Sequence, residues 1–190
     1  MGAIATRHQL LITQPIPGVE PHHAITRVID CNVYIRPADG GLMLGGYESD
    51  PLQLDMAKQP SAFRIEDLPL DLTVLRRLIG LVADQFPVLR EIAVKEHRGG
   101  LPTMTADGEH IVGPLEGLRG LYVAGGCCVG GLTIAPIIGD LLAEWIISGK
   151  PPMDLSPLSP ARPAVQTTLE AALREDCRRQ YAFHYWPKHA

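Results

Sequence analysis

The stretch Leu121–Gly149, LYVAGGCCVGGLTIAPIIGDLLAEWIISG, decides how this chain folds. It consists of a short apolar run, a glycine-rich turn and an apolar segment of helical length. LYVA is apolar on both faces, which is typical of a strand inside a parallel sheet. The segment 132–148 is expected to be a helix that Gly149 ends. A strand, turn and helix in this order are typical of a cofactor-binding unit.

The glycine-rich turn contains Gly125, Gly126, Gly130 and Gly131 in the spacing G-G-x-x-x-G-G. Glycines there permit positive φ angles and a close approach of the backbone to a ligand. The start of the helix offers free N–H groups and a positive dipole end, which suit a phosphate or a ring that gains negative charge. The spacing is neither G-x-G-x-x-G nor that of a P-loop. The glycines are equally compatible with a tight strand-to-helix turn that holds no ligand.

Composition limits the classes of partner. The chain has 190 residues, 46% of them hydrophobic, and a formal net charge of −4 without a basic block. A nucleic-acid interface is therefore not expected. The longest apolar run carries Asp140 and Glu144, so a membrane span is not expected either. The N-terminus lacks the apolar region of a signal peptide.

The four cysteines and seven histidines do not form a recognisable reactive motif. No C-x-x-C pair is present, which favours a reducing compartment. We interpret the adjacent Cys127 and Cys128 as small packing residues, because neighbouring cysteines rarely bind one zinc ion together. The position of Cys128 near a helix start leaves modest thiol activation open. The histidines form no H-E-x-x-H motif, and no metal site is predicted.

The rest of the chain predicts antiparallel strands, one covering helix and a polar tail, an α+β fold. Asp39-Gly40 between apolar runs indicates a hairpin. The tail has a proline-rich linker, a polar helix over 167–180 and the aromatic segment YAFHYWPKHA, which requires a partner surface. The predicted strands are His8–Thr13, Val28–Pro37, Leu42–Tyr47, Glu91–His97 and His110–Val112, and the predicted helix has an apolar stripe of Leu72, Leu75, Leu78, Ile79, Val82 and Phe86.

Tyr34 and Arg36 are two residues apart on one predicted strand and therefore share a face. On an exposed sheet face they would suit a carboxylate or an amine. They are equally compatible with a role as edge residues without a ligand.

Taken together, three segments resemble a known family. They are VYIRPADGGLMLGGYE (33–48), GGLPTMTADGEHIVGP (99–114) and GLYVAGGCCVGGLTIAPIIGDLLAEWI (120–146). In this order they resemble the C-terminal half of the FAD-dependent amine oxidoreductases of the D-amino-acid oxidase superfamily, especially the sarcosine and dimethylglycine dehydrogenase branch. KPPMDLSPLSPARP followed by CRRQYAFHY resembles the segment with which that branch leaves its flavin domain.

The resemblance implies a substrate domain with a large antiparallel sheet and a Rossmann-like FAD domain. Residues 1–114 would be the later part of the substrate domain. Residues 115–150 would be the strand and helix that return to the FAD domain, and residues 151–190 a proline-rich linker and aromatic tail. LYVA would then find its sheet neighbours in an N-terminal half.

The resemblance also implies site residues. The turn that matches Val129-Gly130-Gly131-Leu132-Thr133 lies against the flavin, with the helix start near the pyrimidine end of the ring. The loop that matches Gly100-Leu101-Pro102 runs beside the isoalloxazine, and the tyrosine that matches Tyr34 faces the substrate. No catalytic residue and no metal ligand is assigned.

Two departures from the family pattern matter. The G-x-G-x-x-G segment that binds ADP is missing, so we expect a missing N-terminal half or a partner chain to supply it. Some members carry a substrate-carboxylate arginine where this chain has Leu101, so a simple amino-acid oxidase is disfavoured.

The resemblance therefore predicts part of an FAD-dependent enzyme that oxidises a secondary or tertiary N-methyl amine, such as a sarcosine- or dimethylglycine-like substrate. The expected location is the cytoplasm, or the mitochondrial matrix in a eukaryote, without the targeting segment. The alternative is a non-catalytic remnant or an assembly subunit that docks onto a separate FAD-binding chain.

Overall fold

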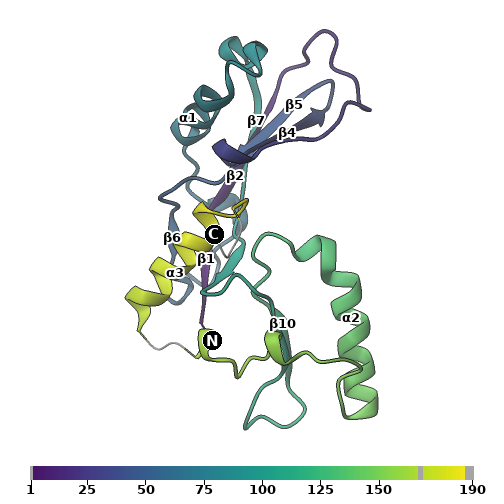
Figure 1. Cartoon of the computed structure of the whole chain (residues 1–190). Helices are drawn as coiled ribbons and strands as arrows, with labels where there is room; N and C mark the ends of the chain where they lie inside the picture. The colour runs from purple at the N-terminus through teal and green to yellow at the C-terminus, as the bar shows by residue number, and fades with distance from the viewer. Residues whose placement is uncertain (1, 167–168, 187–190) are drawn as a thin grey trace. The chain divides into compact units, whose positions relative to one another are not determined.

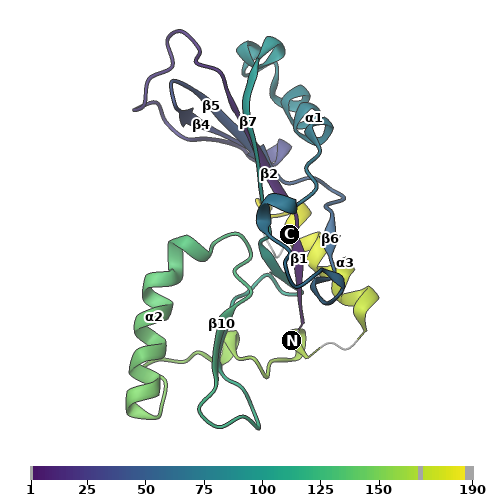
Figure 2. The ribbon, with the colours of Figure 1, turned by 180° about the vertical axis from the view of Figure 1, so that it is seen from behind.

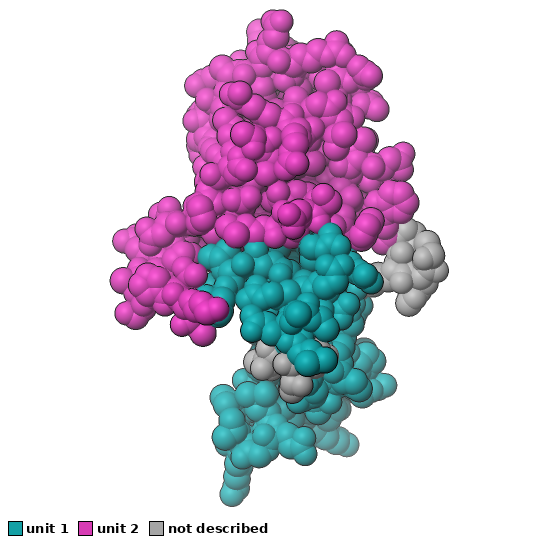
Figure 3. Space-filling view, turned by 90° about the vertical axis from the view of Figure 1, so that its left-hand side faces the viewer, with its two compact units in different colours: residues 1–6, 53–56, 102–181 teal, residues 7–52, 57–101, 182–190 magenta. Residues whose placement is uncertain are grey.

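The computed structural model describes residues 2–166 and 169–186 (Figures 1 and 2). The chain forms two compact units, coloured separately in Figure 3. Unit 1 comprises residues 1–6, 53–56 and 102–181, and unit 2 comprises residues 7–52, 57–101 and 182–190. All strand pairs are antiparallel, which agrees with the predicted α+β class.

Unit 2 is built on a five-stranded sheet with the order β3-β4-β5-β2-β7. The predicted hairpin between β4 and β5 is confirmed, with Asp39 and Gly40 both at positive φ (53° and 77°). Such a turn matches the right-handed twist of the two strands that it joins. The strands are β2 (His8–Thr13), β3 (Thr26–Val28), β4 (Val33–Ala38), β5 (Gly41–Gly46) and β7 (Val94–Gly100).

The single strand predicted over Val28–Pro37 is wrong. A 3₁₀ turn, η1 (Ile29–Cys31), interrupts it, and Asn32 takes a left-handed conformation with φ 54°. Asparagine adopts this conformation more readily than most residues. The chain therefore reverses, and β3 pairs with β4 through Val28 and Val33.

Helix α1 (Leu72–Val82) covers one face of this sheet. The Asp71 carboxylate caps its start by accepting a hydrogen bond from the Thr73 backbone N–H (2.9 Å). Leu75, Leu78, Ile79 and Val82 of the predicted apolar stripe are buried, whereas Leu72 and Phe86 are partly buried and the helix ends at Val82, before Phe86. The core beneath it comprises Leu11, Val33, Ile35, Leu44, Val74, Leu75, Leu78, Ile79, Val82 and Leu89.

The segment before β7 differs from the prediction. Pro87–Glu91 forms a 3₁₀ turn, η4, so the strand begins at Val94 rather than at Glu91. Proline favours the first turn of a helix because its N–H is not needed there. Two further 3₁₀ turns precede α1, η2 (Met56–Lys58) and η3 (Ile65–Asp67).

Unit 1 contains a three-stranded sheet with the order β6-β1-β8 and a two-stranded sheet of β9 and β10. The LYVA strand is antiparallel to β9, through Val123 opposite Gly113, and a parallel neighbour from an N-terminal half stays a prediction. The strands are β1 (Ala3–Thr6), β6 (Gln53–Leu54), β8 (Thr103–Thr105), β9 (Ile111–Pro114) and β10 (Tyr122–Gly125).

The predicted helix after the glycine-rich turn is confirmed as α2 (Gly131–Ser148), and Gly149 ends it at φ 75°. The polar tail helix is α3 (Glu170–Ala182). The first two residues of its predicted range, 167–168, lie outside the described residues. Between these helices, η5 (Ser156–Leu158) and η6 (Pro163–Val165) shape the proline-rich segment.

Arg162 anchors the proline-rich segment to unit 1. Its Nε and Nη2 donate to the two carboxylate oxygens of Asp107 (2.6 and 3.0 Å), and Nη2 also donates to the carbonyl of Glu109 (2.8 Å). The Arg162 side chain is only 9% exposed, so the pair is screened from water. The predicted domain division at residues 114 and 150 concerns the complete fold and stays a prediction.

Candidate functional site

The face of the unit 2 sheet opposite α1 carries an aromatic cluster. His8 and Leu10 alternate with the core residue Leu11 on β2, so they point away from α1. Tyr34 alternates with Val33 and Ile35 in the same way on β4. The ring of Tyr34 lies across Gly45 of β5, where a Cβ atom would overlap its Cζ and Oη atoms. Gly45 therefore provides the space through which Tyr34 reaches β2.

A hydrogen bond joins the two polar members of this cluster. His8 Nε2 lies 2.9 Å from Tyr34 Oη. Burial, together with the smaller effect of the nearby His184, lowers the pKa of His8 to about 4. Burial likewise raises the pKa of Tyr34, Tyr185 adds to the increase, and the positive charge of Arg36 opposes it. Both side chains are therefore uncharged at neutral pH.

His184 and Tyr185 of the aromatic tail pack against this cluster, and residues 187–190 lie outside the described part. The Tyr47 ring lies between its partners, with centroids 4.4 Å from His184 and 5.1 Å from both Tyr185 and His8. The Arg27 guanidinium lies 5.5 Å from the Tyr185 ring centroid. The partner surface that the tail requires is thus found in unit 2. We call His8, Tyr34, Tyr47, His184 and Tyr185 the aromatic cluster.

The glycine-rich turn of unit 1 is strained at residues that are not glycine. Cys128 has φ 42° and Val129 has φ 65°. Positive φ is a genuine outlier for a β-branched residue such as valine, and such strain concentrates at ligand-binding sites. At Gly131 a Cβ would lie 2.9 Å from Cys127 Cβ and 3.0 Å from its Sγ. A larger residue at position 131 would therefore clash with Cys127. Glycine is needed there for packing, whether or not the turn binds a ligand.

The start of α2 is open to a ligand. Gly130 precedes the helix and supplies no side-chain cap. The Thr133 N–H donates to the Gly130 carbonyl (3.2 Å), so the Gly131 and Leu132 N–H groups are those that would donate to a ligand. Leu132 in the first turn is 95% exposed. An uncapped helix start after a strained turn fits the electron-rich pyrimidine end of a flavin. Val129, Gly130, Gly131, Leu132 and Thr133 are the residues that would hold it.

The remaining length of α2 is apolar, yet none of its residues is buried in the described structure. By length and composition alone this helix would be able to cross a membrane, a test that core helices of soluble proteins also pass. Ile137, Ile146 and Ile147 are more than half exposed. Among the described residues, Tyr122 and Gly113 lie beside Trp145 of α2, and these isoleucines stay exposed.

Gly100, Leu101 and Pro102, the loop predicted to run beside the flavin, are divided between the two units. Gly100 ends β7 in unit 2, where a Cβ would meet nothing within 4 Å, and Leu101 follows it. Pro102 belongs to unit 1, and its carbonyl accepts a hydrogen bond from the Thr6 N–H (2.9 Å). The structure brings Tyr34 together with His8, a partner that the sequence interpretation missed. The signal available was the alternation of β2, with His8 and Leu10 on one face.

None of the four cysteines forms a disulfide in the described structure. Cys128 Sγ lies 3.3 Å from Thr105 Oγ1, and Cys177 donates to the Met104 carbonyl (3.2 Å). Among the described residues, no group of histidine, cysteine, aspartate or glutamate side chains is arranged to hold a metal ion. These contacts support the interpretation of Cys128 as a packing residue.

Comparison with known proteins decides the family. The model of FAD dependent oxidoreductases, DAO, matches residues 3–145. The chain belongs to this family. FAD is therefore confirmed as the family's cofactor, and the predicted resemblance is confirmed.

The relatives include mitochondrial sarcosine dehydrogenase of Homo sapiens, 30% identical over 80% of this chain and 16% of its own length. Mitochondrial dimethylglycine dehydrogenase of Mus musculus is 30% identical over 95% of this chain and 22% of its own length. The 4-methylaminobutanoate oxidase (formaldehyde-forming) of Paenarthrobacter nicotinovorans is 30% identical over 96% and 22%. This chain thus spans about a fifth of the length of these relatives.

Among solved structures, glycine oxidase from Geobacillus kaustophilus superimposes with a TM-score of 0.65 at 21% identity. The match covers 85% of this chain and 40% of that chain. At this identity the likeness shows the fold, which is that of DAO-family flavoenzymes.

Proposed function

We propose that this chain is part of an FAD-dependent enzyme that oxidises a secondary or tertiary N-methyl amine to an imine, which water then hydrolyses. The observation that carries the proposal is the His8–Tyr34 pair on the sheet face opposite α1 in a DAO-family chain. The compounds in the names of the relatives, sarcosine, dimethylglycine and 4-methylaminobutanoate, are the candidate substrates.

The aromatic cluster would bind the amine in its reactive state. Bound FAD supplies the redox chemistry by accepting a hydride from the carbon attached to the nitrogen. Loss of that hydride requires a free lone pair on nitrogen, hence the neutral amine. None of the cluster side chains carries a negative charge at neutral pH, because the pKa of each tyrosine is raised and His8 is neutral. The cluster therefore offers no counter-charge to a buried ammonium. It therefore favours the amine over the ammonium form.

Tyr34 and His8 would then orient the neutral amine. With its Oη shared with His8 Nε2 (2.9 Å), Tyr34 has a fixed hydroxyl direction rather than a freely rotating one. A hydroxyl held in this way places a nitrogen lone pair and its neighbouring carbon reproducibly, which is the geometric part of catalysis.

In unit 1, the start of α2 would contribute electrostatics. The first N–H groups of the helix and the positive end of its dipole stabilise negative charge near Gly130 and Gly131. The strained Val129 backbone would aim those groups. Gly100, Leu101 and Pro102 are proposed to line the edge of the ring.

A missing N-terminal half, or a partner chain, would bind the ADP part of FAD. The support is the length of the relatives and the apolar α2, none of whose residues is buried in the described structure. We also propose a location in the cytoplasm, or in the mitochondrial matrix of a eukaryote; the support is that two of the relatives are mitochondrial by name.

The test uses the complete protein and the visible absorption of its flavin. We expect N-methylglycine, N,N-dimethylglycine or 4-methylaminobutanoate to bleach the oxidised flavin bands in the absence of oxygen. Tyr34→Phe should slow bleaching about 10-fold through loss of the oriented hydroxyl, with unchanged flavin content. A flavin-loaded protein that no N-methyl amine reduces would refute the proposal.

The exposed α2 favours one alternative, an assembly subunit that docks onto a separate FAD-binding chain. A colourless complete protein that co-purifies with a flavin-containing partner would support this alternative. In that case alanine substitution of Ile137 should weaken the complex, whereas substitution of the exposed Leu81 on α1 should not.

A further inference from the structure

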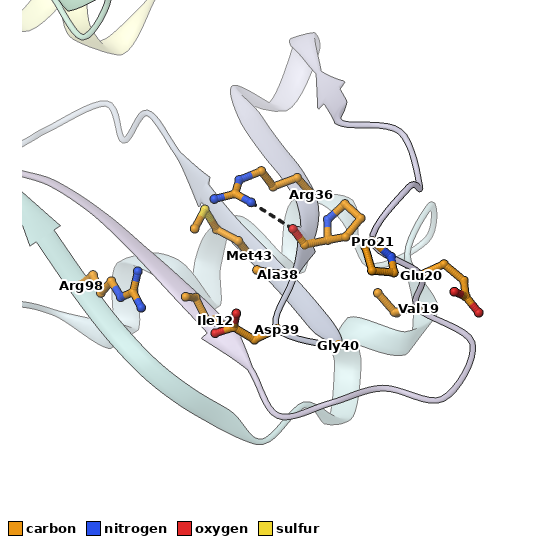
Figure 4. Close-up of a pocket in the computed structure, with 11 residues that line it drawn as sticks. Ile12, Val19, Glu20, Pro21, Arg36, Ala38, Asp39, Gly40, Met43 and Arg98 are labelled. Atoms are coloured by element: carbon orange, nitrogen blue, oxygen red, sulfur yellow. Dashed lines mark hydrogen bonds between the residues drawn. The ribbon is translucent and has the colours of Figure 1, made fainter. Parts of the chain in front are cut away.

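A pocket of about 370 Å³ lies in unit 2, at the end of the sheet near the β4–β5 hairpin (Figure 4). Its lining includes Ile12, Met43, Arg36 and Arg98. Arg36, Met43 and Ile12 are register partners across β4, β5 and β2, so they share one face. That face also carries Tyr34, because alternate residues of a strand point the same way.

The floor of the pocket is apolar. Ile12 is 2% exposed and Met43 is 8% exposed. They form the row next to Gly45 and Leu10, the residues that pair beside Tyr34. An aliphatic chain that starts at the His8–Tyr34 pair would therefore run along apolar side chains on its way to Arg36, about 7 Å further along the strand.

Two of the four charged residues that line the pocket are paired with neighbours. Asp39 accepts from Lys95 Nζ (3.1 Å), and Arg98 Nε donates to Glu96 (2.7 Å). Among the described residues, neither Arg36 nor Glu20 forms an ion pair, and Arg36 donates only to the Pro37 carbonyl (3.0 Å). In Figure 4 the Arg36 and Glu20 side chains point in opposite directions. The guanidinium thus keeps donors for an anion, and planar guanidinium groups bind carboxylates with two hydrogen bonds.

Arg36 also lies within electrostatic reach of the amine site. Burial and Tyr185 raise the pKa of the Tyr34 phenol, whereas Arg36 lowers it. A ligand that touches the Tyr34 hydroxyl therefore experiences the charge of Arg36, which repels an ammonium and attracts an acid.

We propose that Arg36 and the apolar floor of Ile12 and Met43 form a subsite for the carboxylate end of the substrate. The preferred substrate is then an N-methyl amino acid whose acid is separated from the amine by several methylene groups, rather than N-methylglycine. This inference rests on the proposed function, because it takes the His8–Tyr34 pair as the amine end.

The test is calorimetric binding to the complete protein, which needs no turnover. The probes are N-methylglycine, its homologue with two more methylene groups, and the neutral primary amide of that homologue. We expect the long acid to bind 10- to 100-fold more tightly than its amide, since hydrogen bonds to a charged group are lost in the amide. Arg36→Gln should abolish that difference, and Arg36→Lys should keep part of it.

Arg90→Gln is the control, because Arg90 is exposed and paired with Asp84 outside the pocket, and it should leave the difference unchanged. Equal binding of long acid and amide by the wild-type protein would overturn the inference without any variant. So would an acid–amide difference that Arg36→Gln preserves. A protein that binds the long acid through Arg36 but oxidises no N-methyl amine would sustain the subsite and refute the proposed function.

Discussion

Gly45→Ala is the sharpest perturbation of the candidate site, because it adds one methyl group without removing any site residue. A Cβ at Gly45 would overlap Tyr34 Cζ and Oη and lie 3.0 Å from Cε1. The Gly45 φ angle is not in the left-handed region, so the backbone accepts alanine. The Tyr34 ring is what must move, and its hydrogen bond to His8 is lost.

The expected effect on stability is small. Loss of the hydrogen bond costs about 1 kcal/mol, and a displaced rotamer costs about 1 kcal/mol more. Alanine in place of a strand glycine recovers about 0.5–1 kcal/mol. The free energy of unfolding should therefore fall by about 1 kcal/mol. The rate of flavin reduction by an N-methyl amine should fall at least 10-fold, because the hydroxyl no longer orients the amine.

Chemical denaturation and anaerobic stopped-flow reduction measure the two effects. Gly80→Ala on α1 is the matched control, since a Cβ there meets nothing within 4 Å. It should raise the free energy of unfolding by about 1 kcal/mol through helix propensity and leave the reduction rate unchanged. A Gly45→Ala protein with the wild-type reduction rate and substrate affinity would refute the role given to Tyr34.

Two further predictions concern unit 1. Asp107→Asn should lower the free energy of unfolding by about 2 kcal/mol, because the largely buried Arg162 loses its partner. Partial burial raises the pKa of Asp107, yet the Arg162 hydrogen bonds hold it below the usual value, so the stabilisation is present above the unfolded pKa near 4 and is lost as pH falls. Urea titration at neutral and acid pH checks this, and a variant equally destabilised at both would contradict it. Val129→Gly should raise the free energy of unfolding by about 1 kcal/mol, since the strain at φ 65° exceeds the entropy that glycine adds to the unfolded chain; a destabilised variant in thermal denaturation would argue against strain there.

Local patterns in the sequence predicted the elements that depend on neighbouring residues alone. The stripe of Leu75, Leu78 and Ile79 specified α1, and Asp39-Gly40 specified the hairpin. The apolar segment ended by Gly149 specified α2. Periodicity and turn chemistry act over a few residues, so they are readable without the fold. The same patterns failed where a short turn competed with a strand, as at Asn32.

The tertiary structure alone decided the pairings. β10 lies against β9 because the intervening segment is short enough for an antiparallel return, whereas its apolar composition had predicted a parallel neighbour. His8 lies on β2 and Tyr34 on β4, with β5 between the two strands. The two side chains meet because Gly45 of β5 leaves room for the Tyr34 ring. His184 and Tyr185 join them through the folding back of a tail more than 130 residues further along the chain. Such contacts depend on strand order and register.

The glycine-rich turn combines both kinds of information. Its glycines and the helix after it follow from the sequence, and family membership supports the proposal that they contact FAD. The strain at Val129 and the contact between Gly131 and Cys127 appear only in the folded chain. The sequence by itself determined which segments form the elements of this protein and which family they resemble. The tertiary structure decided which side chains meet, because only the folded sheet brings residues distant in the chain within hydrogen-bonding distance.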